Sequence, residues 1–246
     1  MKIIIFMPAY NAAKTIESVF PRIPKSVYRK LHKIIIVNDG SRDDTAKVVK
    51  KLSRLYKKIK LITHKVNRGY AQTQKTGYKA ALAMGADVVV MLHSDGQYSP
   101  EYLDKLLEPL ENNKADVVQG SRILGGEALK GGMPSYKFVG NRISSFIENI
   151  VSGLDISEYH SGYMLYNKKA LTKIPFEKLA DIYHSHKGTC HYDGEMILIS
   201  NRMGLRIKEV PIPTIYAGEI SHVNPYTYGF EVLQVIIRYV TKRYKF

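Results

Sequence analysis

The sequence predicts an α/β protein with a mostly parallel central sheet flanked by helices. The first half of the chain alternates short runs rich in Ile and Val with longer amphipathic stretches, which is typical of βα units with right-handed crossovers. The apolar runs lack polar alternation, as expected for strands that are covered on both faces. The 246 residues contain no internal repeat and no low-complexity linker, so we expect one continuous domain.

The elements of the first half follow from these periodicities. The expected strands are Lys2–Met7, Lys33–Asp39, Ile59–Thr63, Val88–Leu92 and Asp116–Gln119. The expected helices between them are Ala12–Val19, Asp44–Lys57, Tyr70–Met84 and Pro100–Asn112. Ser41-x-x-Asp44 and Ser99-Pro100 are suitable helix starts, and Gly85 is a suitable helix end.

After Gly120 the pattern is less regular. Glycine pairs at 125–126 and 131–132 predict a loop. The expected helices of this half are Asn141–Gly153, Lys168–Ile174 and Asp193–Met203, and the expected strands are Ser161–Tyr166 and Arg206–Pro211. The segment Ala180–Tyr192 is polar and His-rich without clear periodicity.

The net charge of +15, from 37 basic and 22 acidic residues, indicates an anionic partner. We favour a phosphate-bearing substrate and an anionic membrane surface over nucleic acid, because no nucleic-acid motif is present and basic and acidic residues mix along the early helices. Cys190 is the single cysteine, which excludes an internal disulfide. The apolar runs are too short for a signal peptide or a spanning helix, so a cytoplasmic protein, or one peripheral to a membrane, is expected.

The most informative stretch is a buried strand that ends in metal-competent side chains. His93, Asp95 and Gln97 alternate directly after it. Because an open α/β sheet places its chemistry at the carboxyl ends of its strands, we expect Asp95 to hold a divalent cation against a diphosphate, with Gln97 and His93 as neutral donors. Imidazole favours Mn²⁺ over Mg²⁺. The alternative for His93 is a packing or hydrogen-bonding role.

Two further strand ends carry polar loops. The first strand leads into Pro8-Ala-Tyr-Asn11 and the second into Asn38-Asp-Gly-Ser41. Both loops precede helix N-termini, whose free N–H groups favour anions. Asp39 is able to accept hydrogen bonds from a base or a ribose, although this tetrapeptide is also ordinary turn chemistry. Neither G-x-G-x-x-G nor G-x-x-x-x-G-K-[ST] occurs, which weakens dinucleotide and ATP readings.

Together these motifs resemble one family, the family-2 inverting glycosyltransferases of the GT-A fold, particularly the dolichol-phosphate-mannose-synthase-like branch. The matching segments, in order, are Pro8-Ala-Tyr-Asn11, Val37-Asn-Asp-Gly-Ser41 with Asp44-Thr45, Asn67-Arg-Gly69 with Lys75 and Gly77, His93-Ser-Asp-Gly-Gln-Tyr-Ser-Pro-Glu101, Gly120-Ser-Arg122, Ser161-Gly-Tyr163 and Tyr192-Asp-Gly-Glu195. Each is weak by itself, but seven in order at compatible spacing form a strong signal.

The resemblance implies a single GT-A (Rossmann-like) domain over residues 1–246. Residues 1–120 would bind a UDP- or GDP-sugar, and residues 121–246 would bind the acceptor and carry a basic C-terminal helix. The implied reaction is transfer of the sugar, assisted by Mn²⁺ or Mg²⁺, to a polyprenyl (dolichyl) phosphate. Two alternatives stay open: a saccharide hydroxyl as acceptor, or a catalytically impaired nucleotide- or lipid-binding protein.

The resemblance also implies residue roles. The nucleotide-binding set comprises Pro8, Tyr10, Asn11, Asp39, Gly40, Ser41, Asn67, Lys75 and Ser94. Arg122 and Arg142, with Ser161, would grip an acceptor phosphate or the departing diphosphate. The implied catalytic set is Asp95, Asp193, Glu195 and Arg122. Asp193 would be the base for an alcohol acceptor, whereas a phosphate acceptor needs no base.

Three positions depart from the family pattern. Ala12 replaces an acidic residue, His93 replaces the first aspartate of D-x-D, and Tyr216 replaces a late arginine. These departures put a nucleotide contact, the choice of metal and acceptor-phosphate recognition in question. A zinc site built from His184, His186, Cys190 and His191 fits no common spacing, so a polar loop on the acceptor side is expected there.

The C-terminal tail, Tyr226–Phe246, is amphipathic and basic. Its apolar face consists of Val232, Val235, Ile236 and Tyr239, and its nearby cations are Arg238, Lys242, Arg243 and Lys245. This pattern fits an interfacial helix on anionic lipid. It also fits an ordinary helix whose apolar face packs on the domain, which we favour.

Overall fold

The computed structural model describes residues 1–180, 191–214 and 225–244. Within these residues the strands form one seven-stranded sheet of order β3-β2-β1-β4-β6-β5-β7. The strands are β1 (Ile3–Ala9), β2 (Leu31–Asn38), β3 (Ile59–Thr63), β4 (Val88–Met91), β5 (Val117–Ser121), β6 (Met164–Asn167) and β7 (Ile207–Pro211). β6 runs antiparallel to β4 and β5, and the other described pairs are parallel. The expected α/β class and mostly parallel sheet are therefore confirmed.

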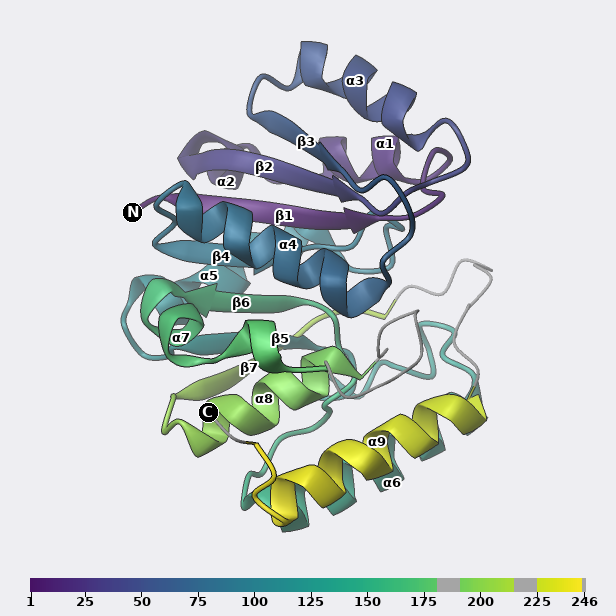
Figure 1. Ribbon diagram of the computed structural model, residues 1–246, viewed down its shortest axis with the longest axis vertical. Coiled ribbons are helices and arrows are strands. Elements are labelled where there is room, and N and C mark those ends of the chain that lie inside the picture. Colours follow the sequence, from purple (N-terminus) through teal and green to yellow (C-terminus); the bar gives the residue numbers. More distant parts are fainter. Residues whose placement is uncertain (181–190, 215–224, 245–246) are drawn as a thin grey trace.

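Helices cover both faces of this sheet (Figure 1). They are α1 (Ile16–Val19), α2 (Lys25–Lys30), α3 (Thr45–Leu55), α4 (Tyr70–Ala83), α5 (Leu103–Glu111), α6 (Ser135–Ser152), α7 (Lys168–Lys173), α8 (Tyr192–Arg202) and α9 (Pro225–Val240), with short 3₁₀ turns η1 (Phe20–Arg22), η2 (Pro100–Tyr102) and η3 (Phe176–Lys178). The sequence analysis did not predict α2, and it started α6 six residues late. Gly153 ends α6 with a φ of 71°, as a left-handed C-cap requires.

Burial on both faces explains why the strands are continuously apolar. Along β1, Ile3 and Ile5 belong to a core cluster that also contains residues of α3 and α5. Ile4 and Phe6 point the other way, into a cluster with residues of α4 and α8. Successive side chains of a strand alternate between faces, so a strand between two cores must be apolar at every position.

The parallel register brings three strand ends to one edge. Ala9 of β1 pairs with Asn38 of β2, and Phe6 of β1 pairs with Met91 of β4. Hydrogen bonds then tie the following loops together. The Ser94 hydroxyl donates to the Pro8 carbonyl at 2.8 Å. The backbone loops after β1, β2 and β4 therefore meet at the carboxyl edge of the sheet.

The antiparallel β6 brings a distant segment to the same edge. Its residues pair with β4 on one side, Val90 opposite Leu165, and with β5 on the other, Gln119 opposite Met164. The amino end of an antiparallel strand lies at the carboxyl edge of its neighbours. Residues 158–163, which precede β6, therefore join the strand-end loops.

At the C-terminal end of the chain, α9 packs against α6, as Figure 1 shows at the bottom of the view. The apolar face that the sequence indicated, with Val232, Val235 and Tyr239, is buried against the domain. Packing of that face is thus the correct interpretation. No helix within the described ranges is long and apolar enough to cross a membrane.

Candidate active site

The loops after β1 and β2 are held together by their own polar groups. The backbone N–H of Asn11 donates to the Ser41 hydroxyl at 2.9 Å, and Asn11 itself has a φ of 50°. Gly40 has a φ of 65°, and an added Cβ would lie 2.5 Å from the backbone nitrogen of Asn67. Only glycine fits this close approach of two backbone segments. Tyr10 stays 44% exposed beside these loops.

Asp39 organises the loop before α4. Its buried carboxylate accepts hydrogen bonds from the backbone N–H groups of Arg68 and Gly69, each at 2.9 Å, and lies 2.7 Å from Nδ1 of His64. These partners already occupy much of the carboxylate. A base-reading role for Asp39 stays a prediction, whereas its structural role is clear: it connects the carboxyl end of β2 to the start of α4.

The alternation after β4 gives three side chains access to solvent. His93, Asp95 and Gln97 are partly exposed, whereas the positions between them are buried. The backbone N–H of Gln97 donates to the Asp95 carboxylate at 3.0 Å. Burial by itself raises the pKa of Asp95, but His93 in its charged form and the backbone N–H groups of Gln97 and Asp95 together outweigh this effect and lower it. Asp95 is therefore an ionised, accessible carboxylate at the sheet edge.

Tyr70, at the start of α4, links this strand end to α8. Its hydroxyl donates to the Asp193 carboxylate at 2.7 Å and lies 3.0 Å from Nε2 of His93. Gln74, one turn further along α4, donates to the other Asp193 oxygen at 2.9 Å. Burial raises the pKa of Asp193 against the opposing effect of these two hydrogen bonds. His93 and Asp193, expected from sequence, thus lie in one network.

This network assigns the tautomer of the His93 ring in its neutral form. Because the Tyr70 proton goes to Asp193, the Tyr70 oxygen accepts from His93, which places the ring proton on Nε2. Nδ1 then carries a lone pair and faces Oδ2 of Asp95 at 3.7 Å. That gap is too long for a good hydrogen bond. It suits two ligands of one ion, which lie roughly 3 to 4 Å apart when each metal–ligand distance is about 2.1 Å. The donor set therefore fits a divalent cation.

The absence of a side chain at Gly162 leaves room for the His93 ring. A Cβ at Gly162 would lie 2.3 Å from Nε2 of His93 and 2.9 Å from the Tyr70 hydroxyl. The Gly162 backbone N–H donates to the Tyr98 hydroxyl at 2.8 Å. The glycine of the Ser161-Gly-Tyr163 segment thus lets the chain before β6 pack directly on the strand-end histidine.

Arg122 is held in place by a buried acid. Its guanidinium bonds the Glu158 carboxylate at 2.9 Å and the His160 carbonyl at 2.7 Å, and its side chain is 12% exposed. Asn141 donates to the same carboxylate at 3.0 Å. The sequence analysis missed Glu158. A phosphate-binding role for Arg122 remains a prediction that has to accommodate this ion pair.

Two other predicted acceptor residues differ in accessibility. Arg142 lies on the exposed side of α6 and donates to the Ser157 carbonyl at 3.0 Å. Ser161 is fully buried, and its hydroxyl donates to the Gly120 carbonyl. Arg142 is therefore placed to meet an external anion, whereas Ser161 joins the segment before β6 to the end of β5.

The Glu195 carboxylate makes its hydrogen bonds with the C-terminal part of the chain and with Ala180. Its fully buried carboxylate accepts from Arg238 of α9 at 3.0 Å, from the Tyr244 hydroxyl at 2.8 Å and from the backbone N–H of Ala180 at 2.9 Å. Burial raises the pKa of Glu195, against the charge of Arg238. These contacts give the carboxylate a structural role between α8 and α9, and the prediction of a catalytic role gains no support from the geometry.

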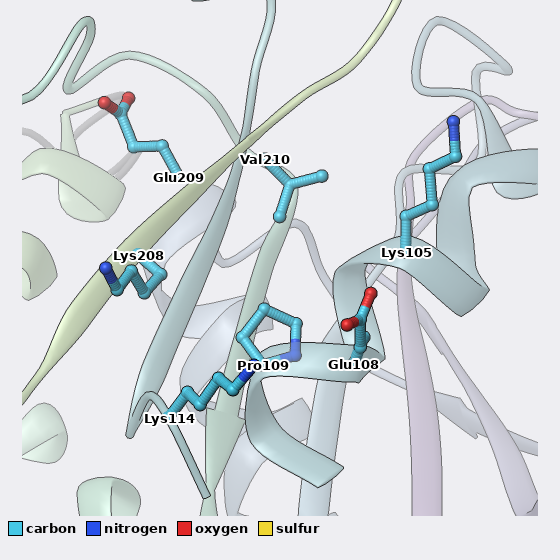
Figure 2. A pocket seen from close by; sticks show the side chains of 7 residues that line it. All are labelled: Lys105, Glu108, Pro109, Lys114, Lys208, Glu209 and Val210. Carbon is cyan, nitrogen blue, oxygen red and sulfur yellow. The ribbon is translucent and has the colours of Figure 1, made fainter. Parts of the chain in front are cut away.

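Two surface depressions lie near the sheet and α4. A depression of about 450 Å³ lies between α5 and the edge strand β7, and Figure 2 shows its lining of Lys105, Glu108, Pro109, Lys114, Lys208, Glu209 and Val210. None of these is a predicted site residue. A second hollow, of about 290 Å³, lies along α4 and includes the predicted Lys75 with Arg68 and Lys79. Glu177 also lines this hollow and pairs with Lys79 at 2.6 Å.

Several positions discussed in the sequence analysis lie outside the described residues. Tyr216, His184, His186 and Cys190 lie outside the described ranges. Sequence reasoning missed Tyr70 and Gln74, although their spacing of four on a predicted helix next to the Asn67-Arg-Gly69 segment was a usable signal.

The seven-stranded α/β sheet with a carboxylate-bearing strand end has the GT-A fold. Residues 4–174 match Glycosyl transferase family 2, and the chain belongs to that family. It is similar to UDP-N-acetylglucosamine–dolichyl-phosphate N-acetylglucosaminyltransferase of Methanococcus voltae, with 34% identity over 226 residues that cover 87% of this chain and 86% of that protein.

Other relatives have related names. The undecaprenyl-phosphate mannosyltransferase of Micrococcus luteus is 25% identical over 212 residues, which cover 86% of this chain and 83% of that protein. Among solved structures, glucosyl-3-phosphoglycerate synthase from Mycobacterium tuberculosis, in complex with Mn²⁺, UDP and phosphoglyceric acid, superposes with a TM-score of 0.71 at 17% identity, over 97% of this chain and 78% of that one. This likeness confirms the fold.

Proposed function

We propose that this glycosyltransferase moves a sugar, with inversion, from a nucleoside diphosphate sugar to a polyprenyl phosphate. UDP-N-acetylglucosamine and dolichyl phosphate are the first pair to test, since the relative at 34% identity carries both in its name. The observation that carries the proposal is the accessible pair His93 and Asp95 at the carboxyl edge, joined to Asp193 through Tyr70. Residues 1–120 would bind the donor and residues 121–246 the acceptor.

Transfer of the sugar requires that the negative charge of the departing nucleoside diphosphate be neutralised. The acceptor oxygen forms a bond to the anomeric carbon while the bond from that carbon to the diphosphate breaks, and the electron pair leaves with the nucleoside diphosphate. A divalent ion, Mn²⁺ or Mg²⁺, would supply charge neutralisation of that diphosphate. Asp95 would hold the ion with His93 and Gln97. The loops that contain Pro8, Tyr10 and Asp39 would orient the nucleoside.

A phosphate acceptor explains why no free base is needed. A polyprenyl phosphate is already ionised at neutral pH, so its oxygen attacks without losing a proton. Asp193 then serves as a positioning residue, because both of its oxygens accept bonds from α4. If the acceptor were a sugar hydroxyl, Asp193 would have to act as general base, and its loss would cost about 10²- to 10⁴-fold in rate.

The test measures transfer of labelled sugar into a lipid-extractable product. We expect Asp95→Asn to lower turnover by at least about 100-fold, because an uncharged amide holds the cation poorly. Asp104→Asn, at an exposed position on α5, is the matched control and should leave turnover unchanged. Full activity of Asp95→Asn across a Mn²⁺ titration would refute the proposed role. Asp193→Asn should lose less than about tenfold with the phosphate acceptor.

We also propose that the enzyme meets its lipid-linked acceptor by docking α6 and α9 on an anionic bilayer. Large apolar side chains form an exposed stripe on each of these packed helices: Tyr136, Val139, Ile143, Phe146, Ile147 and Ile150 on α6, and Phe230, Leu233, Ile237 and Val240 on α9. Exposed apolar patches of this extent mark interaction surfaces. The flanking cations Arg142, Lys242 and Arg243 are exposed, which favours anionic lipid.

Vesicle sedimentation tests this docking. Replacing Phe146 and Phe230 together with serine should weaken binding to phosphatidylserine-containing vesicles by more than about tenfold, since a buried phenylalanine side chain is worth about 1.5–3 kcal/mol. Leu55→Ser, an exposed apolar change on α3, is the control. Equal binding of the double variant, or a stable dimer that buries this face in solution, would overturn the docking proposal while leaving the transfer reaction intact.

A further inference from the structure

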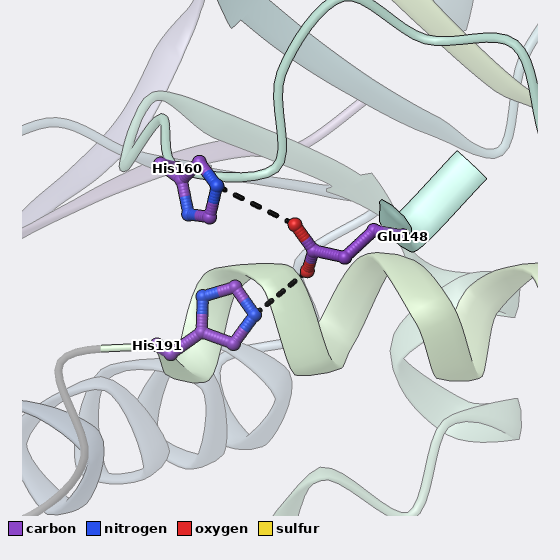
Figure 3. A group of neighbouring side chains, drawn as sticks. All are labelled: Glu148, His160 and His191. Carbon is purple, nitrogen blue, oxygen red and sulfur yellow. Dashed lines mark hydrogen bonds and ion pairs between the residues drawn. The ribbon is translucent and has the colours of Figure 1, made fainter. Parts of the chain in front are cut away.

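A second cluster of titratable groups lies outside the strand-end site. Glu148 comes from α6, His160 from the segment before β6, and His191 from the N-cap of α8. One ligand-capable atom from each residue lies within 4.8 Å of the others. Figure 3 shows both imidazoles pointing at the carboxylate of Glu148.

The orientation of the two rings is specific. Both Nδ1 atoms face one hydroxyl, that of Tyr228 on α9, at 2.7 Å for His160 and 3.2 Å for His191. Both Nε2 atoms therefore face Glu148, at 3.4 Å from Oε2 and 2.8 Å from Oε1 respectively. Histidines that bind metals commonly donate the other ring N–H to such a partner, which fixes the tautomer.

Two atoms of this cluster are buried without a hydrogen bond. Nε2 of His160 and Oε2 of Glu148 make none within the described residues, although their side chains are only 7% and 0% exposed. Buried polar atoms are rarely left in this state, and each one requires an explanation. When Nδ1 of His160 donates to Tyr228, Nε2 carries a lone pair that faces the Glu148 carboxylate, and this contact is repulsive unless a cation lies between the two atoms.

We propose that Glu148, His160 and His191 bind one divalent transition-metal ion of the zinc type, at a site separate from the strand-end site at Asp95. Two imidazole nitrogens and one carboxylate are a common zinc donor set. Ligands of a tetrahedral zinc ion lie about 3.3 Å apart. The three ligand atoms here lie within 4.8 Å of one another, so the side chains have to draw together when the ion binds.

The ion would join the parts of the acceptor half. Through its ligands and Tyr228 it would connect α6, the segment before β6, the start of α8 and α9. Gly194 makes room for this arrangement, because a Cβ there would lie 2.1 Å from Cε1 of His191. Asp193 follows His191 by two residues, so a fixed His191 also fixes the start of the helix that carries Asp193.

Metal analysis of the untagged, full-length protein tests the site. After incubation with Zn²⁺ and gel filtration, we expect about one zinc ion per chain and a melting temperature several degrees above that of the chelated protein. Glu148→Gln and His160→Gln should lose the ion. Asp95→Asn, in the strand-end site, and His32→Gln, at an exposed histidine, should retain it.

A measurement on the wild-type protein covers the case in which the cluster variants fail to fold. X-ray absorption of the zinc-loaded chain should show two imidazole ligands, whereas a single histidine is expected at the strand-end site. Absence of bound zinc in the wild type, fewer than two imidazoles, or loss of the ion in Asp95→Asn would show a hydrogen-bonded cluster only and overturn the proposal. Sugar transfer is not part of this readout, so the two proposals fail separately.

Discussion

The Tyr70 hydroxyl is the most informative single group to remove. It donates to Asp193 at 2.7 Å and accepts from Nε2 of His93 at 3.0 Å. Tyr70→Phe keeps the ring and deletes both contacts. The proton of His93 is then free to move to Nδ1, the nitrogen that faces Asp95. A protonated Nδ1 cannot bind a cation, so the variant should bind Mn²⁺ more weakly.

The magnitude follows from the role of the hydroxyl. Loss of a hydrogen-bond partner of a metal-binding histidine commonly costs 10- to 100-fold in metal affinity, or about 1.4–2.7 kcal/mol. The assay is a titration of free Mn²⁺ by electron paramagnetic resonance in the presence of saturating UDP. Tyr102→Phe, on the turn before α5, is the matched control. An unchanged Mn²⁺ affinity in Tyr70→Phe would refute both the tautomer assignment and the ligand role of His93.

Three further changes test the architecture around this site. Gly162→Ala should lower turnover by about 10- to 100-fold without unfolding the protein, because the new Cβ displaces the ring of His93. Steady-state kinetics measure the turnover, and circular dichroism checks that the variant is folded. Normal turnover would contradict the prediction. Asp116→Asn should lower the free energy of unfolding in urea by about 2–3 kcal/mol, because the buried carboxylate accepts several bonds from Arg206. The Arg206 hydrogen bonds depress the Asp116 pKa, so this contribution is complete above about pH 5 and is lost as the pH falls below about 4, toward the folded-state pKa; a difference between wild type and variant that grows on acidification would be the wrong sign. Gly40→Ala should cost about 2 kcal/mol in the same assay, since it combines a positive φ with a backbone clash, and an unchanged urea midpoint would show that the loop relaxes at no cost.

The sequence by itself determined the α/β class and the edge of the sheet that carries the site. Strands buried on both faces must be apolar throughout, so β1, β2 and β4 were visible as runs of Ile and Val, and the polar residues after each run marked their carboxyl ends. Asp95 and His93 could be predicted as site residues because they directly follow such a run. Gly40 and Gly162 were recognised from the sequence as parts of motifs, but the close contacts that require glycine at these positions were seen only in the structure.

Only the tertiary structure decided which groups share a network. The antiparallel insertion of β6 between β4 and β5 brings residues 158–163 to the edge, and no local periodicity encodes that pairing. Burial then separates two carboxylates that look alike in sequence: Asp193 meets α4 beside the strand end, whereas Glu195, two residues later, meets α9. Side chains two apart on a helix point in different directions.

The strand end His93–Gln97 shows the division most clearly. The alternation of His93, Asp95 and Gln97 was readable from the sequence, although the segment folds as a turn with Gly96 at a φ of 80° and does not continue the strand. The state of the His93 ring was not, since it depends on a tyrosine of α4 and, through it, on a carboxylate of α8. Hydrogen bonds between distant elements arise only when the chain is folded, and they determine which nitrogen is available to a cation.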